Sequence, residues 1–431
     1  MSMIIIVTLL LMAVLLSMGV WVGIALAGVG IFSLEIFRHM PVEKLLAQTV
    51  SNVSTSPELV ALPLFILMGE ILFRTKLSKL LFDGLSPWTR HIPGRLLHTN
   101  VLGCTLFAAI SGSSAATTAT VGRITFNELT SRGYDPRIAA GSLAGAGTLG
   151  FLIPPSTLMI VYGVLAQVSV LKMFMAGIIP GLLLALAFMV YVAIYALLNP
   201  DRLPKDDTRT TLRELLVGLL QLGPVVLLIG FVVGSMMSGF ATPTEAAAMG
   251  VMGALLVCVL QRCFTWRGMW EALMGAMQTS SMIGLIIIGA VFLSVAMGFL
   301  KVPATIAETI GGLGLSPFAL IMLLIVFYVI LGAVLEGMSI IVMSLPITLP
   351  LITAAGYDPI WFGVFLILVV EMAQVTPPVG FNLFVLNGLS GMPLSTLARA
   401  AMPFFLILVA FTVLITVFPE IVLYLPRTLE H

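Results

Sequence analysis

The chain has 431 residues, of which 60% are hydrophobic and only 9% are charged, and its formal net charge is +1. A soluble domain carries about 25% charged residues, so this composition excludes a water-soluble globular protein, and the small net charge gives no sign of nucleic-acid binding. Many apolar runs are about 20 residues long, enough for a helix to cross about 30 Å of hydrocarbon, and they lack the alternation of barrel strands. We therefore predict an all-α polytopic membrane protein in a lipid bilayer.

The apolar runs are separated by short polar loops along the chain. Residues 3–34 are too long for one upright helix, and Ser17-Met18-Gly19 offers a break, so two short helices are expected there. The further predicted spans are residues 59–73, 173–198, 215–236, 246–260, 269–299 and 404–425, and the run 269–299 is long enough to be tilted or broken.

Two stretches differ from ordinary spans. Residues 96–110 are apolar but short, they reach the cluster SGSS at residues 111–114, and a second helical stretch leaves that cluster. Residues 318–335 similarly reach the segment EGMS at residues 336–339, and residues 340–352 leave it. Exposed backbone at membrane depth is tolerated only where it lines a cavity or is buried in protein. We predict two re-entrant helical hairpins with these clusters as their tips.

Each predicted hairpin is followed by an apolar run that a pair of prolines interrupts, Pro154-Pro155 in the first and Pro377-Pro378 in the second. Proline removes an amide donor and clashes with the preceding helical turn, so two in succession unwind a helix. A simple structural kink is the competing interpretation of each pair. We predict two broken helices.

The same landmarks recur at one fixed offset. The sequence GYDP occupies residues 133–136 and again residues 356–359, which is 223 residues later, and both the proline pairs and Pro180 and Pro403 are separated by the same number. Such a fixed spacing indicates an internal duplication. We therefore predict a repeat in which each half contains one hairpin and one broken helix.

The distribution of positive charge predicts how the halves are oriented. If the two hairpins enter from opposite sides, 15 of the 20 Lys and Arg residues lie in the cytoplasm, and five lie outside: Arg38, Lys44, Lys172, Lys301 and Arg427. Positive charge is retained on the cytoplasmic side. The two halves are then an inverted repeat.

Inverted repeats whose broken helices meet near the midplane are the architecture of secondary transporters. We expect the hairpins and broken helices, residues 96–168 and 316–391, to form an elevator-type transport domain. The scaffold is expected to comprise residues 1–95, 169–267 and 392–431, with a linking span at residues 268–315. In a transporter of this kind, the N-termini of the half-helices favour binding of a carboxylate, and the carbonyl groups of the unwound backbone favour binding of Na⁺.

Hydroxyl and carbonyl oxygens at the tips and breaks favour a hard cation over a transition metal. The predicted Na⁺-binding residues are Ser111, Gly112, Ser113, Ser114, Gly147 and Thr148 in the first half, and Glu336, Gly337, Ser339, Thr376 and Pro377 in the second. Small residues of this kind also allow close helix packing, which is the competing interpretation. Of the acids in or near spans, Glu70, Glu245, Glu336 and Glu371, the tip residue Glu336 is the strongest candidate.

Arg123 follows the first tip and is the obvious candidate to meet a carboxylate, because a guanidinium binds one bidentately, although an interfacial anchor is an equally good interpretation. The other predicted substrate-binding residues are Pro154, Pro155, Ser156, Gln374 and Asn382. Gln374 and Asn382 can equally act as hydrogen-bonding contacts between helices.

Two other classes of function remain open from the residues alone. An intramembrane enzyme needs a catalytic constellation, but His39, His91, His98 and His431 pair with no carboxylate at metal-ligand spacing. A passive channel fits the paired hairpins less well, because it needs a continuous pore. We expect neither an enzyme nor an organic cofactor.

Three segments, SGSSAATTATVG from residue 111, GAGTLGFLIPPS from residue 145 and EMAQVTPPVGFNLFVLNGLSG from residue 371, closely resemble the large membrane subunit of tripartite ATP-independent periplasmic (TRAP) transporters, the DctM or SiaM type. The resemblance spans essentially the whole chain. It implies a Na⁺-coupled importer of a small carboxylate in a bacterial inner membrane. It also implies two partners: a periplasmic binding protein and a separate small membrane subunit of four spans.

Overall fold

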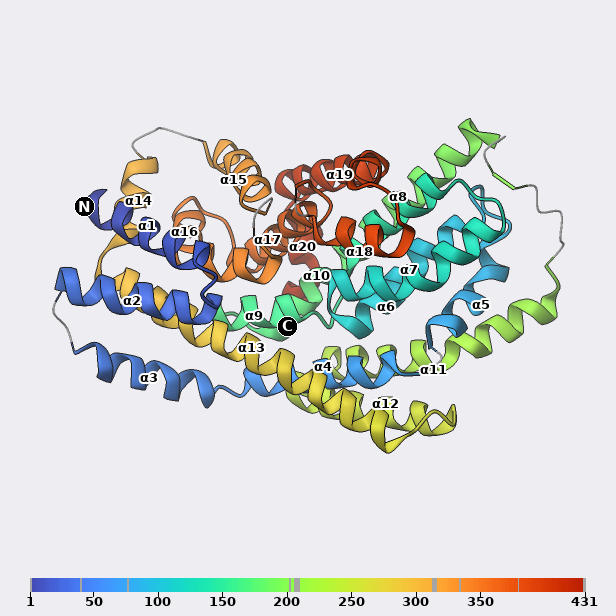
Figure 1. Ribbon diagram of the computed structural model, residues 1–431, viewed down its shortest axis with the longest axis horizontal. Coiled ribbons are helices and arrows are strands. Elements are labelled where there is room, and N and C mark those ends of the chain that lie inside the picture. Colours follow the sequence, from blue (N-terminus) through green and yellow to red (C-terminus); the bar gives the residue numbers. More distant parts are fainter. Residues whose placement is uncertain are drawn as a thin grey trace.

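The computed structural model describes residues 2–38, 41–75, 77–200, 203–204, 210–311, 316–332, 335–378 and 380–428. All regular elements within these residues are helical (Figure 1). The N-terminal helices are α1 (Ser2–Ser17), α2 (Val22–Arg38), α3 (Val42–Ser54), α4 (Glu58–Phe73) and α5 (Leu77–Thr89). The break expected near residue 17 is confirmed, and Gly19 there has φ of 76°, a conformation that glycine adopts at little cost.

The central helices contain the first predicted hairpin and broken helix. They are α6 (Leu97–Ser111), α7 (Ser114–Ser131), α8 (Pro136–Gly147), the 3-10 helix η1 (Thr148–Gly150), α9 (Thr157–Ala166), α10 (Val170–Leu198), α11 (Leu212–Met237), α12 (Pro243–Leu260), α13 (Trp266–Phe299) and α14 (Val302–Gly311). The run 269–299 is not broken: α13 is continuous over 34 residues, which corresponds to about 51 Å at 1.5 Å per residue.

The C-terminal helices are α15 (Pro317–Gly332), α16 (Gly337–Ala354), α17 (Pro359–Gln374), α18 (Phe381–Ser390), α19 (Leu394–Val417) and α20 (Glu420–Thr428). The last span therefore differs from the predicted run 404–425. It begins ten residues earlier and includes Pro403 inside α19, and the chain leaves the helix at Phe418 before α20. A proline within a transmembrane helix is tolerated when neighbouring groups replace the lost hydrogen bond.

Within the residues that the structure describes, six helices are long and apolar enough to cross a membrane: α10, α11, α12, α13, α16 and α19. The pair α3 and α4, bent by 55°, is a seventh candidate. The prediction of a polytopic all-α membrane protein is therefore confirmed for the described residues.

The 223-residue offset is preserved in the secondary structure. Both α7 and α16 contain 18 residues, and their first residues, Ser114 and Gly337, are 223 positions apart (337 minus 114). The starts of α8 and α17, Pro136 and Pro359, have the same separation. The fixed spacing in the sequence thus corresponds to a repeated order of helix, tip, helix, turn and broken helix.

The repeated GYDP sequence is explained by the chemistry of helix boundaries. Gly133 and Gly356 have φ of 83° and 89°, the left-handed conformation that ends a helix, and the next N–H in each case bonds back five residues. Asp135 and Asp358 then cap the following helix by accepting backbone N–H groups, with proline at the first helical position. Each copy of the motif therefore ends one helix and begins the next.

One group of helices forms a long layer along the lower edge of Figure 1, where α13 packs on α2, α3 and α4, and α12 packs on α4 and α11. The predicted hairpin and broken-helix elements pack on one another, α6 with α7 and α8, and α17 with α15 and α16, and α8 also packs extensively on α19. Contacts of α4 and α13 with α9, and of α13 with α16, join the two groups. We refer to α2, α3, α4, α12 and α13 as the outer layer.

The closest helix crossing in the outer layer depends on glycine. A Cβ on Gly23 of α2 would lie 2.7 Å from the carbonyl oxygen of Leu285, and one on Gly289 of α13 would overlap the carbonyl oxygen of Gly23. Small residues of this kind let membrane helices approach with their backbones in contact, which maximises dispersion contacts where no hydrophobic driving force exists.

Gly289→Ala is expected to lower the midpoint of thermal unfolding of the purified protein in detergent, because the added methyl group forces α2 and α13 apart at a cost of about 1–3 kcal/mol. The matched control is Gly284→Ala on the same helix, where a Cβ meets nothing within 4 Å. That control is expected to be neutral or slightly stabilising, since alanine favours a helix by about 0.5–1 kcal/mol over glycine. Equal midpoints for the two variants would contradict the close crossing.

Candidate functional site

The first tip is a two-residue connection between α6 and α7. Gly112 ends α6 with φ of 55°, and Ser113 is the N-cap of α7, where its hydroxyl accepts the N–H of Ala116 at 3.5 Å. A Cβ on Gly112 would lie 3.0 Å from the carbonyl oxygen of Pro155, so the tip lies directly against the first proline pair. Glycine is required here both for its backbone conformation and for the close approach.

The first tip is hydrogen-bonded to the first broken helix. The Thr157 hydroxyl donates to the Gly112 carbonyl at 2.8 Å, and Ser156 caps α9 by accepting the N–H of Met159 at 3.4 Å. A Cβ on Gly150 would lie 2.5 Å from Cα of Ser114. The chain is not helical between η1 and α9, so α8 and α9 are two separate half-helices, as the proline pair predicts.

The second tip and break have a similar arrangement. Glu336 is the N-cap of α16 and accepts the N–H of Ser339 at 3.4 Å, which is the role that Ser113 has in the first half. A Cβ on Gly337 would lie 3.0 Å from the side-chain nitrogen of Gln374, at the end of α17. The helix then stops before Pro377-Pro378 and resumes as α18, so this predicted break is also confirmed. Each tip therefore lies against the broken helix of its own half.

A buried carboxylate connects the two halves. Glu371 of α17 is fully buried, its Oε1 accepts the N–H of Phe151 at 2.9 Å, and its Oε2 lies 2.8 Å from the hydroxyl of Ser114. Phe151 is the first residue after η1. Its N–H therefore lies outside any continuous α-helix and has no regular helical hydrogen bond. The carboxylate therefore satisfies a backbone group that the first break leaves free.

The same serine connects further groups. The Ser114 hydroxyl lies 3.0 Å from the Gly147 carbonyl and accepts the side-chain N–H of Asn382 at 2.9 Å. Asn382 is fully buried, and its Oδ1 has no hydrogen-bond partner among the described residues. We call these groups of Ser114, Gly147, Glu371 and Asn382 the central oxygen cluster. It brings together residues of α7, α8, α17 and α18.

The cluster contains hydroxyl, carbonyl, amide and carboxylate oxygens, which are the ligands that hard cations such as Na⁺ and Ca²⁺ prefer. Among the described residues, no three His, Cys, Asp or Glu side chains are grouped as a metal site.

The family model described as "Tripartite ATP-independent periplasmic transporter, DctM component" matches residues 9–421. The chain belongs to this family. It is 37% identical over 376 residues to the C4-dicarboxylate TRAP transporter large permease protein DctM of Pseudomonas aeruginosa, and the match covers 86% of each chain. It is 31% identical over 414 residues to the isethionate TRAP transporter permease protein DctMQ of Oleidesulfovibrio alaskensis, covering 96% of this chain and 65% of that relative.

Among solved structures, the YdaH transporter of Alcanivorax borkumensis has a TM-score of 0.62 and 14% sequence identity, with 87% of each chain covered. At this identity the likeness supports the fold alone. Family membership and the six apolar spans identify a multi-pass inner-membrane protein that is a transporter permease and not an enzyme.

The predicted site residues of this DctM component lie in several environments. Ser114, Gly147 and Asn382 belong to the central oxygen cluster. Thr148 is fully buried next to it, where its hydroxyl donates to the Gly145 carbonyl, and the hydroxyl of Thr376, two residues after the end of α17, donates back to the Met372 carbonyl. The remaining tip residues Ser111, Gly112, Ser113, Glu336, Gly337 and Ser339 lie at the two tips, and Pro154, Pro155, Ser156, Gln374 and Pro377 lie at the two breaks.

Arg123 is exposed on α7, two and a half turns after Ser114, and it has no contact with the central oxygen cluster among the described hydrogen bonds. The other acids near spans have local explanations. Glu70 pairs with Arg74, with their charged atoms 3.5 Å apart, and Glu245 forms a capping box with Thr242 at the start of α12.

Glu371 is the residue whose importance the sequence analysis missed. It was one of four acids noted near spans, but Glu336 was preferred because of its place at a tip. The available signal was an acid inside the otherwise apolar segment of α17, six residues before a proline pair, at the position that Thr148 occupies in the first half. Its partners, Ser114 and Phe151, lie 257 and 220 residues away in sequence, so only the fold identifies them.

Glu371→Leu is expected to destabilise the protein strongly, because it leaves the N–H of Phe151 and the hydroxyl of Ser114 buried with fewer partners, at about 1–3 kcal/mol per unpaired group. Glu371→Gln keeps an acceptor oxygen and should lose less. Glu420→Leu is the control, since that acid pairs with Arg427 at an exposed position, where ion pairs contribute little. We expect the midpoint of thermal unfolding to be highest for Glu420→Leu, lower for Glu371→Gln and lowest for Glu371→Leu. A Glu371→Leu midpoint equal to wild type would show that the buried contacts do not stabilise the fold.

Proposed function

We propose that this permease of a secondary transporter for small organic acids imports its substrate by coupling to Na⁺, and that the predicted hairpins and broken helices move together as an elevator-type transport domain. The observation that carries this proposal is the paired arrangement of tips and breaks. In each half a helical tip lies against an interrupted helix, where peptide oxygens and N–H groups are free of regular helical bonding.

The proposed first Na⁺ site lies between the first tip and α8. Ser114 and Gly147 already approach each other there, with the hydroxyl and the carbonyl oxygen 3.0 Å apart, and Ser111, Gly112, Ser113 and Thr148 border them. By the repeat, the second site lies between the tip residues Glu336, Gly337 and Ser339 and the break at Thr376-Pro377. Hydroxyl and carbonyl oxygens suit Na⁺ because it is a hard cation that needs no charged ligand.

The substrate is proposed to bind where helix N-termini face the breaks, with Ser156 at the start of α9 and Asn382 in the first turn of α18. A helix N-terminus presents free N–H groups and a partial positive charge to an anion. Gln374 and the proline pairs border this region, and Arg123 is the candidate cation on α7. The relatives named above carry a C4-dicarboxylate and isethionate, a sulfonate, so the proposed class is small organic acids, wider than carboxylates.

Two partners are proposed. The family is the DctM component of a tripartite system, which implies a periplasmic binding protein and a small membrane subunit. The match to the DctMQ relative covers 65% of that longer protein. The exposed apolar faces of α11 and α12, with residues such as Leu220, Leu227 and Met252, face lipid or this subunit.

Ser114→Ala is expected to raise the Na⁺ concentration for half-maximal uptake about tenfold, the effect of losing about 1.4 kcal/mol of binding free energy. Uptake is measured in proteoliposomes that contain the small subunit, with the binding protein and its substrate outside and an imposed Na⁺ gradient. Ser344→Ala is the control, because that buried hydroxyl lies in α16 and contacts Tyr328 away from both breaks. If uptake shows no dependence on Na⁺ in the wild-type protein, the coupling proposal is wrong.

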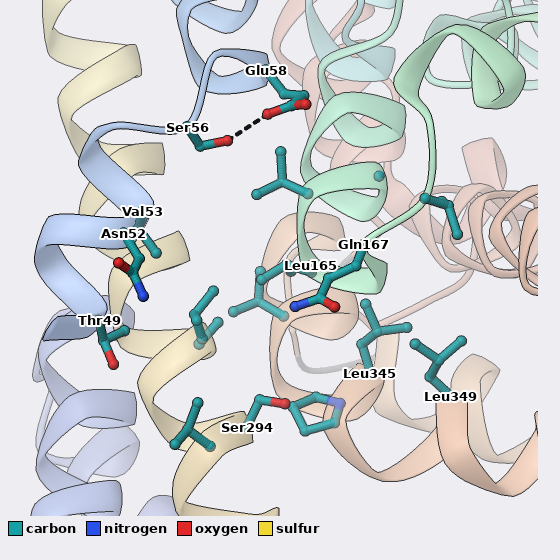
Figure 2. Close-up of a pocket in the computed structure, with 18 of the residues that line it drawn as sticks. Thr49, Asn52, Val53, Ser56, Glu58, Leu165, Gln167, Ser294, Leu345 and Leu349 are labelled. Atoms are coloured by element: carbon teal, nitrogen blue, oxygen red, sulfur yellow. Dashed lines mark hydrogen bonds between the residues drawn. The ribbon is translucent and has the colours of Figure 1, made fainter. Parts of the chain in front are cut away.

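The moving-domain proposal is tested by cross-linking. Asn52 of the outer layer and Gln167 at the end of α9 face one cavity from opposite walls (Figure 2). A bifunctional maleimide joining cysteines at these positions is expected to abolish uptake, because it fixes the broken helix to the outer layer. A pair at Arg74 and Glu271, whose charged groups lie 3.1 Å apart within the outer layer and outside this cavity, should leave uptake intact. Full activity of the cross-linked Asn52–Gln167 pair would refute the motion.

A further inference from the structure

The chain has three cysteines, and the structure brings two of them together. Cys104 is fully buried in α6, whereas Cys258 and Cys263 lie where α12 ends and the connection to α13 begins. The sulfur of Cys263 lies 3.3 Å from the sulfur of Cys258 and 3.1 Å from the Cys258 carbonyl oxygen. Two thiols are therefore in contact at one corner of the outer layer.

The backbone at the end of α12 sets this contact. The N–H of Cys263 bonds to the carbonyl of Cys258 at 3.1 Å, and the N–H of Arg262 bonds to the carbonyl of Val259 at 2.9 Å. Arg262 has φ of 52°, the left-handed conformation. These are the two hydrogen bonds of a Schellman motif, which commonly brings apolar side chains at the positions of residues 258 and 263 into contact. Both positions carry thiols here, so the helix end holds the two sulfurs together before any reaction.

The two thiols differ in accessibility. Cys258 is buried, with 5% of its surface exposed, but Cys263 is only partly buried. A cavity of about 160 Å³ borders both cysteines, and Arg74 of α4 and Gly268 of α13 also line it. A thiol that a reagent can reach, next to one that it cannot, gives the pair an attacking sulfur, Cys263, and a resolving sulfur, Cys258.

The charge around the pair indicates the compartment and the kind of reagent. Arg262 and Arg267 are among the 15 basic residues that the positive-charge distribution assigns to the cytoplasmic side. Cytoplasmic thiols are kept reduced, and disulfides that form there are usually transient and catalytic or redox-sensing. Arg262 is exposed next to Cys263, and Arg74 lines the cavity, so a reagent that carries carboxylates meets positive charge on its approach. Glutathione disulfide is a reagent of this kind.

We propose that Cys258 and Cys263 form a redox-active dithiol, which a low-molecular-weight disulfide such as glutathione disulfide converts to an intramolecular disulfide. The Cys263 thiolate attacks one sulfur of the reagent and breaks its S–S bond, and the first glutathione leaves as a thiolate that takes up the proton lost by Cys263. The Cys258 thiolate then attacks the Cys263 sulfur of the mixed disulfide and expels the second glutathione, which takes up the proton lost by Cys258. Two protein thiols are oxidised to one disulfide, and one glutathione disulfide is reduced to two thiols.

This site is separate from the proposed transport function. Both cysteines lie at the end of α12, and neither belongs to the tips, the breaks or the central oxygen cluster. The chemistry is therefore measured on the thiols themselves. Its failure leaves the Na⁺-coupling proposal standing, and a failure of Na⁺-driven uptake leaves the dithiol proposal standing.

The test equilibrates the full-length protein in lipid nanodiscs with glutathione buffers of known thiol-to-disulfide ratio. After an acid quench, free thiols are labelled with a maleimide under denaturing conditions and counted by mass spectrometry. Oxidation is expected to remove two of the three maleimide adducts and to link the peptides that contain residues 258 and 263, and dithiothreitol should reverse both changes. Cys104→Ser is the matched control and should be oxidised like the parent protein. Because the helix end holds the thiols in contact, their effective concentration should be about tenfold or more higher in the folded protein than in the same chain unfolded in urea and SDS.

Two further variants assign the roles of the sulfurs. Cys258→Ser should stop at the mixed disulfide and retain one glutathione on Cys263. Cys263→Ser should take up no glutathione within the time that fully modifies Cys258→Ser, because the remaining thiol is buried. The inference is overturned if the parent protein accumulates glutathione without an internal disulfide, if Cys263→Ser reacts as fast as Cys258→Ser, or if the folded and unfolded chains have equal effective concentrations.

Discussion

The architecture depends on one constraint: a peptide group inside a membrane protein must find a hydrogen-bond partner even where a helix is interrupted. The chain is not helical between α8 and α9 or between α17 and α18. At these breaks, N–H and carbonyl groups lack the hydrogen bonds that a continuous helix would provide. The N–H of Phe151 is paired by the Glu371 carboxylate, and the Gly112 carbonyl by the Thr157 hydroxyl. Each such hydrogen bond requires a second segment of the chain to approach the break. The need to pair these backbone groups therefore also brings the tips and the broken helices together.

The two halves meet this requirement with different residues, although their helix boundaries repeat. Ser113 and Glu336 cap equivalent helices, and Thr148 and Glu371 precede equivalent proline pairs by six residues. In both cases the second half has an acid where the first half has a hydroxyl. Because Glu371 reaches Ser114 across the repeat, the difference in residue type converts two similar halves into one connected unit. A strictly symmetric sequence would lack this cross-connection.

The outer layer is built on a different principle. Its helices α2, α4, α12 and α13 are largely apolar, whereas α3 is amphipathic. The layer is joined by close glycine crossings such as Gly23 with Gly289, and by the contact of Arg74 with Glu271 near one end. Between this layer and α9 and α16 the packing opens into the cavity that contains Asn52 and Gln167. The boundary between the outer layer and α9 and α16 thus combines direct helix contacts with a cavity of about 650 Å³.

Composition, apolar run length and local helix-boundary chemistry were sufficient to predict much of this protein from its sequence. They predicted the all-α membrane class and the breaks at both proline pairs, because those features depend on residues adjacent in the chain, and the recurrence of GYDP predicted the 223-residue repeat. The continuity of α13 and the passage of α19 through Pro403 were decided by packing against neighbouring helices, which no local pattern encodes. The central oxygen cluster was likewise decided only by the tertiary structure. Its members come from residues 114, 147, 371 and 382, and a buried hydrogen bond between residues more than 200 positions apart exists only once the two halves have folded against each other.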